Sequence, residues 1–280
     1  MEEKMYRAYQ AAKHLLDETS SEEERELLGS MSETDVVVVR GSYDRVQNVL
    51  RIMGIPFLLV EPRDVAALSL RPEQMLVVNC PGHIGPKGVD VVRRFVEGGG
   101  MLFTTDWALK HVLEPAFPGY VAYNRRPTAD DVVRIEIVDK EHSFLKDIFR
   151  DGSDPLWWLE SSSYPIRVLK PDEVRVLLSS SELQQKYGEA PVAITFRYGA
   201  GEVFHMISHY YLQRTETRGA RHKSSWKLYA QEIGAEGVAK ADMPELDALT
   251  TSEVEAAYTS MAFVRRAMMM SRRMKQERDA

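Results

Sequence analysis

Short apolar runs rich in β-branched residues alternate with amphipathic stretches between residues 36 and 105. Four such runs predict strands, and the run at residues 36–39 predicts a strand buried on both faces of a sheet. They span residues 36–39, 56–60, 75–79 and 101–105. Residues 43–54 and 87–97 instead carry apolar side chains at helical spacing, and glycine ends each stretch. Strands that alternate with helices through short connections form right-handed βαβ units, so this region predicts a parallel sheet.

The second half of the chain has a less regular pattern of predicted strands. These strands are expected at residues 131–138, 174–178, 192–197 and 202–209. Their spacing favours a mixed or antiparallel extension of the same sheet over an independent second domain. A short helix is expected over residues 139–149. The fold class predicted for the chain is flavodoxin-like α/β: a doubly wound, mainly parallel sheet with helices on both faces, plus N- and C-terminal helical extensions.

Both ends of the chain predict helices beyond the sheet. We expect a helical segment over residues 1–33, the α/β domain over residues 34–236, and a linker with a C-terminal helix over residues 237–280. Apolar residues of that last helix recur at three- and four-residue intervals, which suits docking against another helix, such as the N-terminal one. Its basic residues, Arg265 and Arg266 among them, are expected on a solvated face. An unknown protein partner, or self-association through this helix, is the predicted interaction.

Charge and cysteine usage restrict the classes of function. The net charge of the 280-residue chain is −6, so electrostatic attraction to nucleic acid or anionic lipid is not expected. Apolar segments stay shorter than the roughly 20 residues that cross a bilayer, and no membrane partner is predicted. The single cysteine, Cys80, excludes an internal disulfide framework and a multi-thiolate zinc site. We expect a cytoplasmic protein with no cofactor and no metal site.

The stretch VRRFVEGGGMLFTTDWAL combines an amphipathic helix, a stop at three glycines and a strand that turns sharply into a helix. Together with the preceding strand, which ends at Cys80-Pro81-Gly82, it resembles the class I glutamine amidotransferase-like superfamily, including ThuA-like members that lack amidotransferase activity. The resemblance covers roughly residues 35 to 213 and implies the α/β fold predicted above. It depends on topology and glycine placement rather than on a unique motif.

The resemblance also implies where a catalytic residue would lie. Active amidotransferases of this superfamily carry a cysteine in the elbow between strand and helix, with a histidine and an acid after the last strand. Here the elbow reads Thr105-Asp106-Trp107, and Cys80 lies one strand too early. The thiolate that glutamine hydrolysis requires is therefore missing from the elbow, so glutaminase activity is not expected.

Cys80 and Asp106 each allow two interpretations. Cys80 could be a nucleophile with His83 as its base, or a buried thiol at the end of a strand. Asp106 could bind a sugar hydroxyl, coordinate a metal or act as a base, because α/β sheets hold ligands at the carboxyl ends of their strands. Alternatively, Asp106 only caps the helix that follows it.

Further candidates lie near the ends of other strands. His205 and His209 stand four apart on the last predicted strand, on one face, and His209 matches the place of the superfamily's histidine. Packing of both rings against neighbouring tyrosines is the alternative. The loop at residues 40–42 could present backbone amides and a guanidinium to an anion. The ligand-binding candidates are Arg40, Gly41, Ser42, Gly82, His83, Trp107 and His205.

Two functions of different class follow from these residues. The leading hypothesis is a catalytically degenerate amidotransferase-like domain that acts as a binding or assembly module, because the elbow lacks its cysteine and the C-terminal end is helical and basic. The alternative is a small-molecule hydrolase or carbohydrate-modifying enzyme that uses Asp106 and His209 in one pocket. Asp106 and His209 within about 4 Å of each other in an open cleft would favour the enzyme, whereas an Asp106 that only caps its helix, with a buried His209, would remove the residues that the enzyme needs. A hydrolase that depends on Cys80 is a third alternative.

Overall fold

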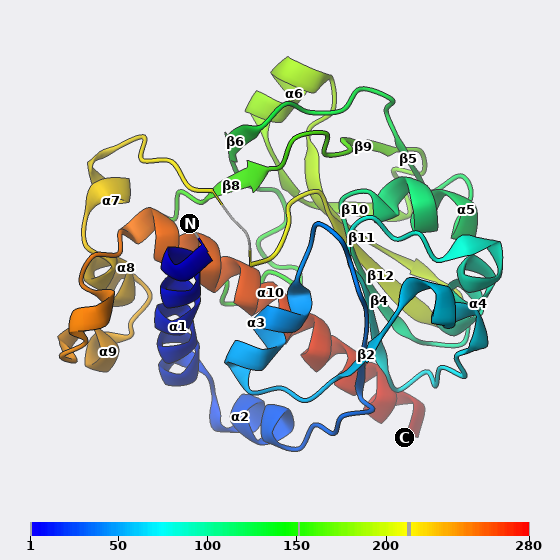
Figure 1. Cartoon of the computed structure of the whole chain (residues 1–280), viewed down its shortest axis with the longest axis horizontal. Coiled ribbons are helices and arrows are strands. Elements are labelled where there is room, and N and C mark those ends of the chain that lie inside the picture. Colours follow the sequence, from blue (N-terminus) through cyan, green and yellow to red (C-terminus); the bar gives the residue numbers. More distant parts are fainter. Residues whose placement is uncertain (1, 151, 212–213, 280) are drawn as a thin grey trace.

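The computed structural model describes residues 2–150, 152–211 and 214–279, and these residues hold an eight-stranded sheet (Figure 1). Five neighbouring strands run parallel, in the order β2 (Leu58–Val60), β1 (Val36–Val39), β3 (Met75–Val78), β4 (Met101–Thr105) and β12 (Gly201–Met206). The antiparallel strands β11 (Pro191–Tyr198), β10 (Val174–Ser179) and β7 (Glu136–Ile137) extend the sheet beyond β12. The predicted flavodoxin-like fold and its antiparallel extension are confirmed.

The central strands form where the sequence is continuously apolar. Every residue of β1, β3 and β4 is buried, as expected for strands that lie between two helical layers. β2 pairs only with β1, at the edge of the sheet, and is less buried. Because β1, β3, β4 and β12 point the same way, the residues that follow them gather at one edge of the sheet.

Helices cover both faces of the sheet (Figure 1). On one face, α10 (Thr251–Asp279) contacts β3 and β4, and α1 (Glu2–Thr19) packs along α10. On the other face, α4 (Gly85–Glu97) contacts β4 and β12. The predicted docking of the C-terminal helix against the N-terminal one is confirmed. The predicted solvated face at Arg265 and Arg266 is wrong, because both side chains are buried among carboxylates and polar groups of other elements.

The other elements connect these layers and cover the edges of the sheet. They are α2 (Glu22–Gly29), α3 (Val46–Met53), η1 (Pro62–Ala67), η2 (Leu109–Leu113), α5 (Glu114–Ala116), β5 (Val121–Tyr123), β6 (Asp131–Arg134), β8 (Leu156–Leu159), β9 (Ile166–Val168), α6 (Ser181–Tyr187), α7 (Ala220–Lys223), α8 (Trp226–Glu232), α9 (Glu236–Lys240) and η3 (Pro244–Leu246). β5 pairs with β9 and β6 with β8, in two separate ribbons. Within the described residues, no helix is long and apolar enough to cross a membrane.

Two local predictions are wrong. Residues 139–149 form a series of turns rather than a helix, and Leu145 and Ile148 donate to carbonyls only three residues back. These turns direct Phe144, Leu145 and Ile148 into the core. The last parallel strand ends at Met206 instead of residue 209, so the chain has already left the sheet when it reaches His209.

Candidate active site

Three polar residues follow neighbouring strands at the carboxyl edge of the parallel sheet. Cys80 comes two residues after β3, Asp106 directly after β4, and His209 three residues after β12. Because these strands are adjacent and parallel, their carboxyl ends meet. One donor atom from each side chain lies within 4.8 Å of the other two. The structure thus brings together the three residues that the sequence offered as catalytic candidates.

Asp106 lies in a strained turn between β4 and the helical segment that follows. Its φ of 42° is in the left-handed region, which residues other than glycine rarely adopt. Its N–H donates to the Met206 carbonyl at 2.8 Å, which ties the turn to β12. The carboxylate accepts hydrogen bonds from the Tyr164 N–H at 2.8 Å and the Ser163 hydroxyl at 3.2 Å. These two residues, rather than the amides of the next helix, hold the carboxylate in place.

His209 lies between two carboxylates. Its Nε2 is 3.0 Å from Asp106 Oδ2, and its Nδ1 is 2.6 Å from Glu160 Oε2. The side chains of His209 and Asp106 are only 3% and 2% exposed, so solvent hardly screens their contact. Burial alone would lower the pKa of His209, but hydrogen bonds with Asp106, Cys80 and Glu160 raise it well above its ordinary value. These hydrogen bonds favour the protonated form of the imidazole.

Cys80 faces this pair as a neutral thiol. Its side chain is fully buried, and burial raises its pKa to about 11. Its Sγ lies 4.0 Å from Asp106 Oδ2. His83, the base expected for a Cys80 nucleophile, is exposed and packs its ring edge-on against His111, with centroids 4.3 Å apart. These contacts favour Cys80 as a buried residue in the wall of the site.

The donors of Cys80, Asp106 and His209 form a set that could hold a metal ion. Thiolate, imidazole and carboxylate are all zinc ligands, and catalytic zinc sites use three protein ligands with a fourth position open to water. Glu160 binds the other ring nitrogen of His209, as carboxylates do when they orient a histidine ligand. The residue types at this edge therefore suit a divalent metal ion as well as proton transfer.

Sequence reasoning missed two carboxylates of the site. Glu160 directly follows β8, and Asp44 lies in the loop after β1. Asp44 is fully buried and accepts hydrogen bonds from the N–H groups of Arg45 at 2.7 Å and Tyr210 at 2.9 Å. Burial raises the pKa of Asp44, although the charge of His209 lowers it in part. The available signal was an acid placed shortly after a buried strand.

The loop after β1 shapes the site through its backbone. A Cβ on Gly41 would lie 2.4 Å from the Cys80 carbonyl oxygen, so glycine allows the loop to pack against the end of β3. The Ser42 N–H donates to the same carbonyl at 3.1 Å, while the Ser42 side chain is exposed. Arg40 instead pairs with Glu61 at 2.7 Å on the protein surface. Gly41 and Ser42 thus border the site, and the guanidinium of Arg40 is directed elsewhere.

A cavity of about 570 Å³ opens near the end of β3. Gly82 and His83 line it together with His111 and the start of α4, and Gly82 adopts a φ of 74° there. Burial lowers the pKa of His111 to about 4, so its ring is neutral at physiological pH. The His111 ring lies 6.5 Å from that of Tyr164, whose N–H binds Asp106. Tyr164 thus lies near the cavity-lining His111 and binds Asp106 through its backbone, while neither Asp106 nor His209 is among the residues that line the cavity.

A row of aromatic side chains borders the same pair. Trp107 stacks on Tyr164 at 5.3 Å and contacts Tyr43 at 5.3 Å, and Tyr164 stacks on Tyr123 at 3.9 Å. The indole N–H of Trp107 donates to the Ser162 carbonyl at 2.7 Å, which fixes the ring. Tyr43 is 45% exposed, so the outer end of the row faces solvent. The row shields Asp106 and offers ring faces to a ligand.

His205 lies apart from these residues. It is fully buried within β12, where its Nδ1 and the Thr104 hydroxyl are hydrogen-bonded at 2.9 Å. Burial lowers the pKa of His205 to about 3, so the ring is neutral. Because β12 ends at Met206, the strand face expected to carry both histidines does not extend to His209.

Comparison with known proteins finds no matching family model and no matching curated protein. Solved structures match at low identity. Cytoplasmic protein STM3548 from Salmonella typhimurium is 14% identical over 63% of this chain and 88% of its own, with a TM-score of 0.44. SMU.1228c is 12% identical over 83% of this chain and 98% of its own, with a TM-score of 0.49. A ThuA-like protein from Bacteroides uniformis is 14% identical over 64% and 84%, with a TM-score of 0.42.

β-Galactosidases are also among the matched structures. This chain spans 31% of the length of the Bacillus circulans enzyme, at 14% identity over 66% of its own length and a TM-score of 0.43. Likeness at this level concerns the fold alone and gives no argument about activity. The similarity to ThuA-like proteins is therefore a similarity in fold.

Proposed function

We propose that this chain is a small-molecule hydrolase whose reacting groups are Asp106 and His209. One observation carries the proposal: Asp106, in a strained elbow at the carboxyl edge of the sheet, contacts His209 Nε2 at 3.0 Å. Glu160 binds the other ring nitrogen, which completes a chain of carboxylate, imidazole and carboxylate. Such chains orient and activate the reacting group in hydrolases on unrelated folds, and a strained strand-to-helix turn is a common place for a nucleophile.

The chemistry divides between the three side chains. Asp106 attacks the electrophilic carbon of the substrate, and the Nε2 proton of His209 passes to the departing oxygen. Water then cleaves the covalent Asp106 ester, returns a proton to Nε2 and releases the second product. Glu160 stabilises the imidazolium through its contact with Nδ1.

The surroundings of the pair support a ring-shaped substrate. The cavity beside His83 and His111 has a volume of about 570 Å³, within the range of small-molecule sites. Aromatic faces at Tyr43 and Trp107 suit a flat or cyclic molecule such as a sugar. We therefore expect a glycoside or a similar small ring compound. The stack of Trp107 on Tyr164 must move to admit it, because Asp106 is buried.

A degenerate binding module is the second candidate. Its sequence-based support came partly from the basic helical C-terminus, but α10 is buried from Thr251 to Met269, so that support is weakened. One observation still favours it: Asp106 and His209 are closed to solvent rather than open to a cleft. In that case the contact between Asp106 and His209 would hold the strand ends together, and the pair would perform no chemistry.

The proposal also places the protein in the cytoplasm. Its single cysteine is free and buried, and a thiol of this kind persists in a reducing compartment. The proposed chemistry needs no disulfide and no oxidising surroundings.

Hydrolysis of chromogenic p-nitrophenyl glycosides tests the proposed function. We expect wild-type turnover, and a loss of about 100-fold or more in kcat for Asp106→Asn and for His209→Gln. The matched control is Asp172→Asn, which makes the same change at an exposed turn. Asp172 precedes β10, which runs in the same direction as β12, so it lies at the opposite edge of the sheet. The control is expected to keep wild-type rates.

Two results would count against the hydrolase. Turnover that survives in both Asp106→Asn and His209→Gln would remove these residues from the chemistry. Binding of intact glycosides without any turnover would favour the degenerate module instead. Circular dichroism of each variant separates a catalytic loss from unfolding.

A further inference from the structure

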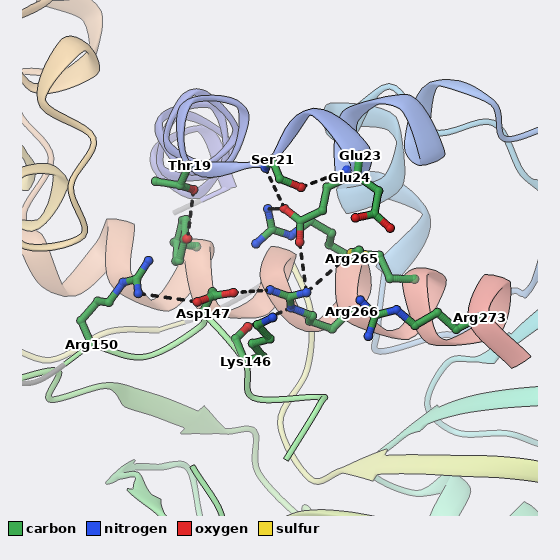
Figure 2. A pocket seen from close by; sticks show the side chains of 12 residues that line it. Thr19, Ser21, Glu23, Glu24, Lys146, Asp147, Arg150, Arg265, Arg266 and Arg273 are labelled. Atoms are coloured by element: carbon green, nitrogen blue, oxygen red, sulfur yellow. Dashed lines mark hydrogen bonds and ion pairs between the residues drawn. The ribbon is translucent and has the colours of Figure 1, made fainter. Parts of the chain in front are cut away.

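A second cavity, of about 390 Å³, lies between the α1–α2 junction, α10 and residues 146–150 (Figure 2). We call it the arginine cavity, and it shares no lining residue with the candidate active site. Its cationic lining residues are Lys146, Arg150, Arg265, Arg266 and Arg273, and its anionic ones are Glu23, Glu24 and Asp147. The lining therefore carries an excess of two positive charges.

Two adjacent arginines of α10 are buried in the wall of this cavity. The side chains of Arg265 and Arg266 are 1% and 5% exposed, and both contact Glu24, at 3.4 Å and 3.0 Å. Arg266 also pairs with Asp147 at 2.9 Å and donates to the Lys146 carbonyl at 2.8 Å. Two buried like charges that share one carboxylate are costly, and a further anion would offset that cost.

Several cationic groups of the cavity have donors to spare. Arg265 Nε is buried and has no hydrogen-bond partner among the residues that the structure describes. Among the described residues, the Lys146 ammonium pairs with no carboxylate, and neither does the Arg273 guanidinium. Arg150 reaches Asp147 only at 3.7 Å, and Figure 2 shows Asp147 between Arg150 and Arg266. The carboxylates present thus leave part of the positive charge unmatched.

We propose that the arginine cavity binds the phosphate group of a small phosphorylated compound. A phosphate monoester carries close to two negative charges at neutral pH, which matches the charge excess of the lining. Guanidinium groups present planar forks of N–H donors that fit phosphate oxygens. The cavity volume is within the range of small-molecule sites. This inference goes beyond the proposed hydrolase and does not depend on it.

Calorimetric titration of the full chain with inorganic phosphate and with phenyl phosphate tests the inference. The informative variants are Lys146→Gln and Arg273→Gln, because both side chains are exposed and neither forms an ion pair with another residue that the structure describes. Each is expected to weaken binding of phenyl phosphate roughly tenfold. The matched control is Lys275→Gln, which removes the same charge from α10 two residues beyond Arg273 and outside the lining. The control is expected to bind like the wild type.

The outcomes distinguish a specific binding site from non-specific electrostatic attraction. Equal weakening in Lys146→Gln, Arg273→Gln and Lys275→Gln would overturn the proposal, because net charge alone would then explain binding. Unchanged binding in the double variant of Lys146 and Arg273 would overturn it as well. A phosphate monoester also occurs in phosphatidic acid, so sedimentation with vesicles that contain this lipid forms a separate arm. Co-sedimentation would overturn the assignment to a soluble compound, and its absence alongside phenyl phosphate binding would support it.

Discussion

The candidate active site and the arginine cavity are both clusters of buried charge, but their balance is opposite. At the strand ends, Asp106 and Glu160 flank a single imidazole, that of His209. In the arginine cavity, guanidinium groups outnumber carboxylates, and the Asp147 side chain is 45% exposed. If the imidazole at the strand ends is removed, a carboxylate is left buried and without solvent. If a guanidinium of the arginine cavity is removed, water can take its place beside the carboxylate. The two regions therefore differ in what the loss of a partner costs.

This difference also separates what the two regions can do. The strand-end cluster is nearly closed, with backbone and hydroxyl donors fixing Asp106, which suits chemistry shielded from water. The arginine cavity has free volume and unmatched donors, which suits the exchange of an anionic ligand. Substitutions at one residue of each cluster test this difference.

The largest effect is expected for His209→Ala. The substitution leaves the carboxylate of Asp106 buried without its cationic partner, so the free energy of unfolding at neutral pH falls by about 3–5 kcal/mol. Urea denaturation monitored by circular dichroism measures the change. The companion variant is His209→Gln, which removes the charge but retains much of the side-chain volume. His205→Ala is not a matched control, because it also opens a cavity inside β12. A loss below about 1 kcal/mol for His209→Ala would show that Asp106 is stabilised by other groups.

A smaller effect is expected for Arg266→Met in the arginine cavity. Glu24 keeps its contacts with Arg265 and with the Ser21 N–H, and the exposed Asp147 is hydrated. We expect the free energy of unfolding to fall by about 2 kcal/mol, less than for His209→Ala. The same urea titration compares the two variants directly. A loss for Arg266→Met that equals or exceeds that of His209→Ala would abolish the distinction between a closed and a hydrated cluster.

The sequence predicts the first cluster better than the second. Continuous β-branched runs mark β1, β3 and β4 as buried and parallel, so the residues directly after them, including Asp106, are expected at one edge. His209 was found from its place after the last strand, although that strand ends three residues earlier than expected. Local pattern was sufficient here because chain direction and strand order decide which ends meet.

Partners that come from distant parts of the chain could not be predicted in this way. Glu160 reaches His209 from β8, which belongs to a separate ribbon with β6, and no periodicity indicates that pairing. Arg265 and Arg266 have the pattern of a solvated basic face, and only Glu24 and Asp147 allow them to be buried. Both cases depend on contacts between residues far apart in sequence, whose positions follow from the packing of the whole fold.

The smallest effect is a difference in pH dependence between the two clusters. The pKa of His209 is raised in the folded state, so the stability that its proton contributes is fully present below about pH 6.5 and is lost as the pH rises. Between about pH 7.5 and 8.5, above the range in which His111 and His205 take up protons in the unfolded chain, the wild-type unfolding free energy should fall by at most roughly 1.4 kcal/mol, before Cys80 begins to titrate in the unfolded chain. His209→Gln should lose this slope, whereas Arg266→Met should keep it, because arginine stays charged throughout the range. Urea titrations across these pH values measure both slopes. If the slope persisted in His209→Gln, a group other than His209 would take up the proton. The contacts of His209 with Asp106 and Glu160 would then not explain the pH dependence.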